Sequence, residues 1–171
     1  MDMRLSQDVE GLANDADATA EELRVPARLI EYERGRFVAL PAHTTLELVE
    51  RPPLTTVPGA PYYCRGLVAW QGRQLPLLDL RALMRAYNDK PPAPFDHVLV
   101  LAFQRAPGQP LEYGALCAPS LVRIIEVSDS QQCALTNDSD LWPWISLSCF
   151  LYEGLVVPVL DTGRLFAQPH C

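Results

Sequence analysis

Hydrophobic positions along most of this chain come in short runs, and turn-forming residues separate the runs. The runs are rich in Val, Leu, Tyr, Phe and Thr, a composition typical of β-strands. The separators, such as RPP, VPGAP, PPAP, APGQP and TNDSD, contain proline, glycine or a polar cluster. The pattern predicts an all-β domain with strands at Arg36–Pro41, Thr45–Glu50, Gly66–Trp70, Arg73–Leu78, His97–Gln104, Leu111–Cys117, Leu121–Val127, Ile145–Tyr152 and Leu155–Leu160.

Two segments depart from the strand pattern. The stretch DLRALMRAYN predicts a short helix, because its apolar residues share one face and Asp79 can accept hydrogen bonds from the first turn. The stretch DVEGLANDADATAEELR is polar and acidic and lacks the aromatic and β-branched residues that would fix it in a core. We therefore expect a flexible acidic arm at residues 1–33, a folded domain at 34–168 and a short tail at 169–171.

An internal repeat organises the strands. WQGRQLPLLDLRALM at 70–84 aligns without a gap with YEGLVVPVLDTGRLF at 152–166. FVALPAHTTLELVE at 37–50 aligns more weakly with YGALCAPSLVRIIE at 113–126. The order of the pieces is the same in both halves, so the halves are expected to share one architecture.

Each strong copy of the repeat has the features of a β-hairpin followed by a helical turn. Its two-residue turn, Gln71-Gly72 or Glu153-Gly154, contains the glycine that a positive φ favours. An aspartate then ends the second strand and can cap the next turn, which is a structural role rather than a catalytic one. One hairpin pair buries too little apolar surface to fold alone, so the repeat predicts two equivalent small barrels that share a core.

Composition excludes several functional classes. The chain has 171 residues, enough for one domain, and a formal net charge of -7 with scattered arginines. This charge argues against binding to nucleic acid or to an anionic membrane surface. No apolar run approaches the roughly 18 residues of a membrane-spanning helix, and the acidic start MDMRLSQDVE does not resemble a signal peptide. We expect a cytoplasmic protein without direct membrane insertion.

The residues that could carry chemistry form no convincing catalytic or metal motif. The five cysteines are odd in number and widely spaced, which argues against a disulfide framework and a zinc site. An enzyme would have to use Cys64, His43, His97 and Asp79, but Cys64 has no sequence context that lowers a thiol pKa. A phosphate-binding glycine loop is also absent. We expect a protein that is not an enzyme and uses no cofactor.

Trp142 and Trp144 follow the acidic loop TNDSD and are separated by one proline. Two aromatic side chains in such a position can anchor a partner helix. The alternative is that they pack the loop onto the second barrel, and the sequence leaves both interpretations open.

The motif R-G-x3-W-Q-G-x3-P-L-L-D-L at residues 65–80, together with LELVE, YGALCAPSLVRIIEV and GLVVPVLDTGRLF, resembles the CheW family of chemotaxis adaptor proteins. The resemblance covers residues 36–166. It implies two interlocked five-stranded SH3-like barrels with short helices. It also implies a non-enzymatic adaptor that couples the signalling tips of methyl-accepting chemoreceptors to the regulatory domain of a CheA-type histidine kinase.

The resemblance also implies partner-binding residues. The receptor-contacting surface of the family matches Leu48, Glu50, Arg65 and Gly66 here. At the family's Asn-Leu-Arg-Gly turn this chain has Gln71 in place of the arginine, and a neutral amide cannot form the arginine's bidentate ion pair. Arg65 and Gln71 flank one strand, and we expect them to project from the same rim, either as contact residues or as plain surface residues.

The departure at Gln71 leaves two functions open. In the first, the chain bridges receptor and kinase, with a receptor tip in the groove between the barrels. In the second, it is a stand-alone SH3-like interaction module that binds the kinase or another partner without a receptor.

Overall fold

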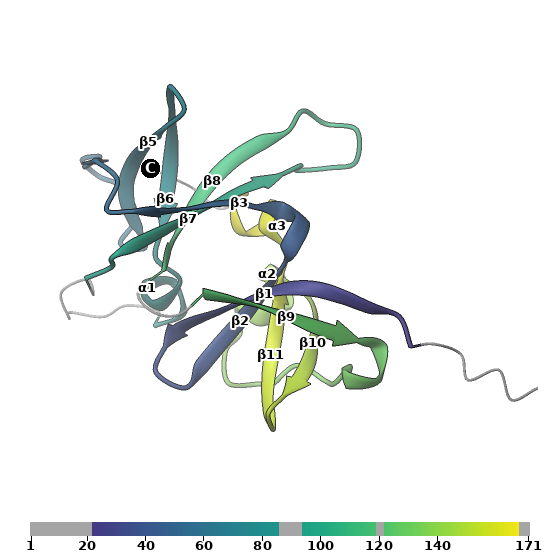
Figure 1. Cartoon of the computed structure of the whole chain (residues 1–171). Coiled ribbons are helices and arrows are strands. Elements are labelled where there is room, and N and C mark those ends of the chain that lie inside the picture. Colours follow the sequence, from purple (N-terminus) through teal and green to yellow (C-terminus); the bar gives the residue numbers. More distant parts are fainter. Residues whose placement is uncertain (1–21, 86–93, 119–121, 168–171) are drawn as a thin grey trace, which may run out of the picture.

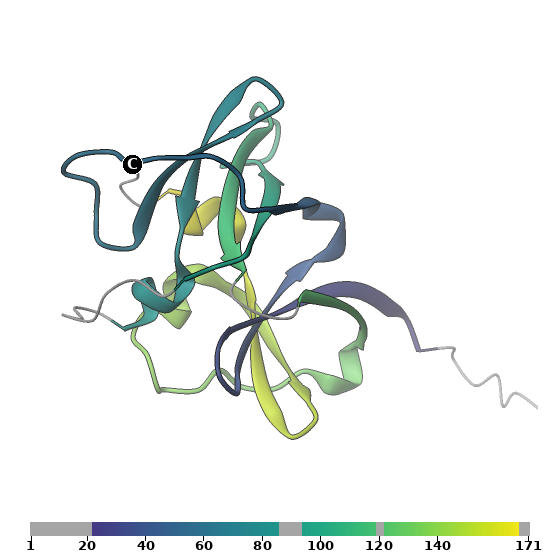
Figure 2. The same ribbon diagram turned by 60° about the vertical axis from the view of Figure 1, so that its left-hand side comes forward.

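The structure is a computed structural model that describes residues 22–85, 94–118 and 122–167. Within these ranges the chain folds into two mostly antiparallel sheets with short helices between or after the strands, as Figures 1 and 2 show from two sides. The first sheet has the order β10 (Ser146–Tyr152), β11 (Leu155–Leu160), β2 (Arg36–Pro41), β1 (Arg24–Glu33) and β9 (Val122–Ser128). The second has the order β3 (Thr45–Glu50), β7 (His97–Phe103), β8 (Glu112–Ala118), β6 (Arg73–Leu78), β5 (Cys64–Trp70) and β4 (Leu54–Thr55).

Short helical elements lie between the strands or after the last one. These are α1 (Leu80–Met84), α2 (Trp142–Ile145), α3 (Thr162–Leu165) and the 3-10 turns η1 (Ala42–Thr44) and η2 (Asp129–Gln131). Of these, η1 links β2 of the first sheet to β3 of the second. None of the helices in the described ranges is long and apolar enough to cross a membrane. The predicted helix from Asp79 is confirmed as α1 over residues 80–84, and its predicted continuation lies largely outside the described residues.

All of the strands predicted from the sequence are present. The bounds of β2, β3, β6 and β11 are the predicted ones, and the other five predicted strands differ by one or two residues at one or both ends. The two-residue β4 was not predicted, because prolines flank it and it is too short to show alternation. It adds a sixth strand to one sheet of the otherwise confirmed fold.

The expectation of an arm over residues 1–33 is wrong for residues 24–33, which form β1 between β2 and β9. Leu29 belongs to an apolar cluster formed by strands of the first sheet, whereas Ile30 and Tyr32 belong to a larger cluster formed by residues of both sheets. A strand buried on both faces shows no simple alternation, so its signal was lost beside the acidic segment before it. The remaining part of the expected arm, residues 1–21, and the expected tail, 169–171, lie outside the described residues.

The structure confirms the repeat in detail. Both hairpin turns have positive φ at both central residues, 45° and 73° at Gln71 and Gly72 and 49° and 79° at Glu153 and Gly154. This is the geometry of a type I′ turn, which matches the twist of the flanking strands. Asp79 accepts a hydrogen bond from the Ala82 backbone N–H (3.1 Å), and Asp161 accepts one from Arg164 (3.0 Å).

The two halves of the repeat exchange strands. β6 from the first half pairs in parallel with β8 from the second, with Leu77 opposite Ala115. β11 from the second half pairs in parallel with β2 from the first, with Val159 opposite Ala39. The same repeat positions meet in both pairings, so the barrels are interlocked as the resemblance implied. We call the barrel built on β3–β8 the first barrel and the barrel built on β1, β2 and β9–β11 the second.

The largest apolar cluster lies between the barrels, and each barrel has a smaller cluster of its own. Phe166, fully buried after α3, stacks on Phe103 of the first barrel with ring centroids 4.8 Å apart. Gly114 leaves room for this ring, because a Cβ there would lie 2.3 Å from Phe166 Cε1. The shared core that the repeat predicted is therefore closed by a residue from its last copy.

Candidate partner-binding site

β3 is an edge strand, and two of the predicted contact residues lie on the face of β3 that points away from the core of the first barrel. Val49 packs against the core of the first barrel, and Glu47 accepts a 2.7 Å hydrogen bond from Trp70 Nε1. Leu48 and Glu50 alternate with these residues and are exposed, Leu48 by 42%. Because Leu48 pairs with Leu99, which belongs to the core between the barrels, this outer face looks toward the second barrel.

The second barrel contributes to the same region through β1 and β9. Arg28 Nε donates a 3.0 Å hydrogen bond to Thr45 Oγ1 at the start of β3. Ile124, directly opposite Arg28 in the β1–β9 pairing, is exposed. Figure 1 shows β3 above β1 and β9. We call Leu48 and Glu50 on β3 and Ile124 on β9 the inter-barrel surface. The Arg28–Thr45 hydrogen bond connects the two barrels at β1 and β3.

Gln71 lies at the exposed tip of the β5–β6 hairpin, next to Trp70. The Trp70 ring packs on Tyr113 with centroids 5.6 Å apart, and its indole N–H reaches Glu47 on β3. The hairpin tip is thereby tied to the strand that carries Leu48 and Glu50. Gln71 stays a predicted contact residue at the edge of this region.

Arg65 is placed elsewhere, at the opposite end of β5 from Gln71. Its Nη1 forms a 3.0 Å ion pair with Asp79 Oδ2, and the side chains are only 16% and 7% exposed. The guanidinium also lies 5.2 Å from the centre of the Phe95 ring. The expectation that Arg65 and Gln71 share one rim is wrong, because Asp79 at the helix start holds the arginine inside the fold.

Gly66 also has a structural explanation. Its φ is 127°, and a Cβ at this position would lie 2.3 Å from the backbone oxygen of Thr55. The glycine therefore allows the close approach of β4 to β5. No contact with a partner is needed to account for the residue type.

Trp142 and Trp144 point to different environments. Trp142 is 2% exposed, donates from Nε1 to Asp138 Oδ1 at 3.0 Å, and meets Tyr32 edge-on. Hydrogen bonds from Thr136 and then from Trp142 lower the pKa of the Asp138 carboxyl. Trp142 is therefore a core residue, which corrects its prediction as a contact.

Trp144 is 71% exposed, and the pyrrolidine of Pro143 between the two tryptophans is exposed as well. Its ring lines a cavity of about 780 Å³ between α1 and α2, together with Tyr62, Met84 and Leu141. Trp144 stays a predicted partner anchor on a surface distinct from β3.

Sequence reasoning missed Glu47 and Ile124. Ile124 belongs to VRIIEV, where adjacent apolar residues hide which face is buried. Glu47 lies in LELVE, where polar and apolar residues alternate. This alternation of Glu47 with Leu46 and Leu48 was the signal that could have identified it. Two exposed leucines flanking an acidic residue would have indicated an outward apolar face on an edge strand.

The sequence argued against a framework of disulfides, but one of the cysteines does form a disulfide. Cys64 is disulfide-bonded, whereas Cys117, Cys133 and Cys149 are free. Burial raises the pKa of Cys117 far above its ordinary value, so this thiol stays protonated and unreactive. In the described ranges no three His, Cys, Asp or Glu side chains gather as metal ligands would.

Residues 30–170 match the family model of the CheW-like domain. The chain belongs to the CheW-like domain family. The family groups chemotaxis scaffold and adaptor proteins involved in signal transduction. The CheW-like fold is shared with the scaffolding protein TtCheW from Thermoanaerobacter tengcongensis, with a TM-score of 0.63 and 12% identity. That comparison covers 81% of this chain and 90% of TtCheW, and at this identity it shows the fold alone. No curated protein sequence matches the chain.

Proposed function

We propose that this CheW-like protein is a cytoplasmic, non-enzymatic adaptor that couples chemoreceptors to a CheA-type histidine kinase. The observation that carries the proposal is the inter-barrel surface, where exposed Leu48 and Ile124 lie on the faces of two barrels that meet at the Arg28–Thr45 hydrogen bond. An apolar face of this kind, with Glu50 beside it, fits the helical hairpin tip of a receptor. The kinase regulatory domain then binds on a barrel face outside this surface.

The inter-barrel surface and the neighbouring tip of the β5–β6 hairpin have separate roles in the proposal. Leu48 and Ile124 supply apolar contact and therefore affinity. Glu50 and Gln71 are exposed and polar, so they set the register and the choice of partner. Trp70 and Glu47 fix the hairpin tip against β3, which keeps these groups in one arrangement before a partner binds. Holding both partners on one small domain raises their effective concentration and makes kinase activity depend on the receptor.

Replacing Leu48 with Asp should weaken binding of a receptor signalling-tip fragment about tenfold or more, because a desolvated apolar contact becomes a buried charge. Isothermal titration calorimetry with the purified chain measures this change. Leu155→Asp is the matched control, since Leu155 is also 42% exposed but lies at the start of β11. Receptor binding that falls equally in both variants would place the receptor site elsewhere.

The glutamine at position 71, where the resemblance leads one to expect arginine, favours an alternative to the adaptor function. In this alternative the protein is a module that binds the kinase without a receptor. The two functions differ in the same titration, because such a module binds the kinase regulatory domain and ignores the receptor tip. Gln71→Arg then distinguishes a lost contact from a lost site. A gain of receptor affinity in that variant means that the inter-barrel surface itself is intact.

A further inference from the structure

The last residue of η2 and the two residues after it run antiparallel along the edge of β10. The Gln131 side chain donates from Nε2 to the Leu151 carbonyl at 3.1 Å. Gln132 forms a β-bridge with Phe150, and the Cys133 N–H donates to the Cys149 carbonyl at 3.2 Å. The 131–133 segment therefore has a fixed register against β10, with Cys133 directly opposite Cys149.

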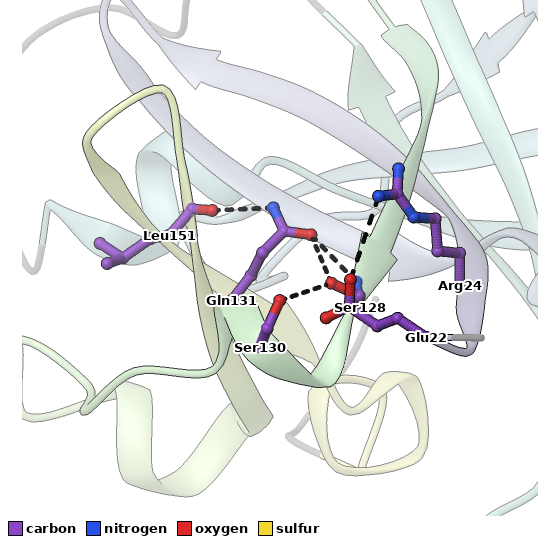
Figure 3. A network of polar contacts seen from close by, with 6 residues as sticks. All are labelled: Glu22, Arg24, Ser128, Ser130, Gln131 and Leu151. Carbon is purple, nitrogen blue, oxygen red and sulfur yellow. Dashed lines mark hydrogen bonds and ion pairs between the residues drawn. The ribbon is translucent and has the colours of Figure 1, made fainter. Parts of the chain in front are cut away.

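A polar network holds the start of this segment, as Figure 3 shows. Gln131 Oε1 accepts from the Ser128 N–H at 2.9 Å, and the hydroxyls of Ser128 and Ser130 lie 3.0 Å apart. The Glu22 carboxylate joins from the segment just before β1, and the Ser130 and Ser128 hydroxyls lower its pKa. The side-chain amide of Gln131 thus bonds with its oxygen to the end of β9 and with its nitrogen to β10.

This register brings the two thiols close enough to form a disulfide after a small movement. Cys133 Sγ and Cys149 Sγ are 3.5 Å apart. Opposite residues of a hydrogen-bonded antiparallel pair have Cα atoms about 5.5 Å apart, inside the range of about 4.4–6.8 Å that disulfides span. Closing the bond needs a side-chain rotation and an approach of about 1.5 Å between the sulfurs, without a change of strand register.

We propose that Cys133 and Cys149 are a modification site that forms a reversible intramolecular disulfide on reaction with a peroxide. In the first step the sulfur of Cys133 attacks one oxygen of the peroxide, the O–O bond breaks, and a sulfenic acid and one water form. In the second step the sulfur of Cys149 attacks the oxidised sulfur, the S–S bond forms, and a second water leaves. Two thiols are oxidised, and one hydrogen peroxide is reduced to two waters.

The surroundings of the two thiols set this order. Cys133 is half-buried and open to a small oxidant, whereas Cys149 is buried and borders a cavity of about 530 Å³. Burial, and then the hydrogen bond with Cys133, raise the pKa of Cys149 to about 11, so at neutral pH it is a poor first nucleophile. Cys149 takes the second step because its sulfur lies 3.5 Å from that of Cys133, where the sulfenic acid forms.

The disulfide would close a loop over residues 134–148. This loop contains α2 with exposed Trp144 and lines the cavity between α1 and α2. Oxidation would therefore restrict the segment that carries the predicted Trp144 anchor. That consequence for partner binding rests on the proposed function, whereas formation of the disulfide does not.

Peptide mapping tests the proposal on the full chain. The protein is treated with hydrogen peroxide, alkylated, digested and analysed by mass spectrometry. We expect a cross-linked peptide that joins Cys133 to Cys149, that dithiothreitol removes, and that is missing from Cys133→Ser and Cys149→Ser. The proposal is overturned if the treated wild-type chain carries Cys133 as sulfinic acid, or joined to a second chain, with no such peptide.

A redox titration in glutathione buffer tests the positioning by Gln131. Gln131→Ala should lower the ratio of disulfide to dithiol about fivefold, the effect of losing one hydrogen bond that aligns the pair. Gln132→Ala is the matched control, because Gln132 is exposed and pairs through its backbone. Equal ratios in the two variants would show that the network of Figure 3 does not position the thiols.

Discussion

Replacing Trp142 with Ala should lower the free energy of unfolding by about 3–5 kcal/mol, the range for removing a buried tryptophan from a core. The ring is 2% exposed between the barrels, meets Tyr32 edge-on and donates to Asp138. The substitution leaves a cavity in the core that both barrels share, and it removes one donor from the Asp138 carboxylate. Urea denaturation followed by circular dichroism measures the change.

Trp144→Ala is the control for this prediction, because it removes the same side chain two positions away. Trp144 is 71% exposed, so its loss should change stability by no more than about 0.5 kcal/mol. Similar costs for the two variants would contradict the assignment of Trp142 to the core. A large loss of partner affinity in Trp144→Ala at unchanged stability would support Trp144 as an anchor.

Asp79→Ala should cost about 3–5 kcal/mol, the effect of breaking a buried ion pair by removing one partner. Asp79 accepts from the first turn of α1 and also pairs with Arg65, so its removal uncaps the helix and leaves a mostly buried guanidinium without its carboxylate. The same denaturation experiment measures this cost.

The internal repeat supplies the control. Asp161 caps α3 in the same way, but its ion-pair partner Arg164 is 58% exposed. Asp161→Ala should therefore cost only about 1 kcal/mol, the usual effect of a lost cap. Equal costs at the two positions would mean that the Arg65–Asp79 pair contributes nothing beyond the cap.

Most of the fold could be predicted from the sequence, because the repeat and the turns are signals that short segments contain. Gly72 and Gly154 adopt the positive φ that a hairpin turn needs and glycine allows, and both aspartates cap a helix as predicted. β1 was missed because burial on both faces is a tertiary property that leaves no alternation in RVPARLIEYE. Its place beside β9 depends on residues about a hundred positions away.

The candidate site was less predictable, because exposure depends on the three-dimensional neighbours of each side chain. Nothing in the sequence distinguished Arg65, which Asp79 holds inside, from Gln71, which the turn exposes. In the same way Trp142 and Trp144 differ only in which side of a four-residue helix they occupy. Leu48 and Glu50 were placed by the resemblance, and their exposure on an edge strand is consistent with contact.

The central claim is that one chain holds a receptor and a kinase at the same time. We would titrate a receptor signalling-tip fragment into the protein already saturated with the regulatory domain of the CheA-type kinase. The account predicts one receptor site per complex, with an affinity at least equal to that of the chain alone. Receptor binding that disappears in the presence of the kinase domain, or that is absent throughout, would contradict the adaptor function.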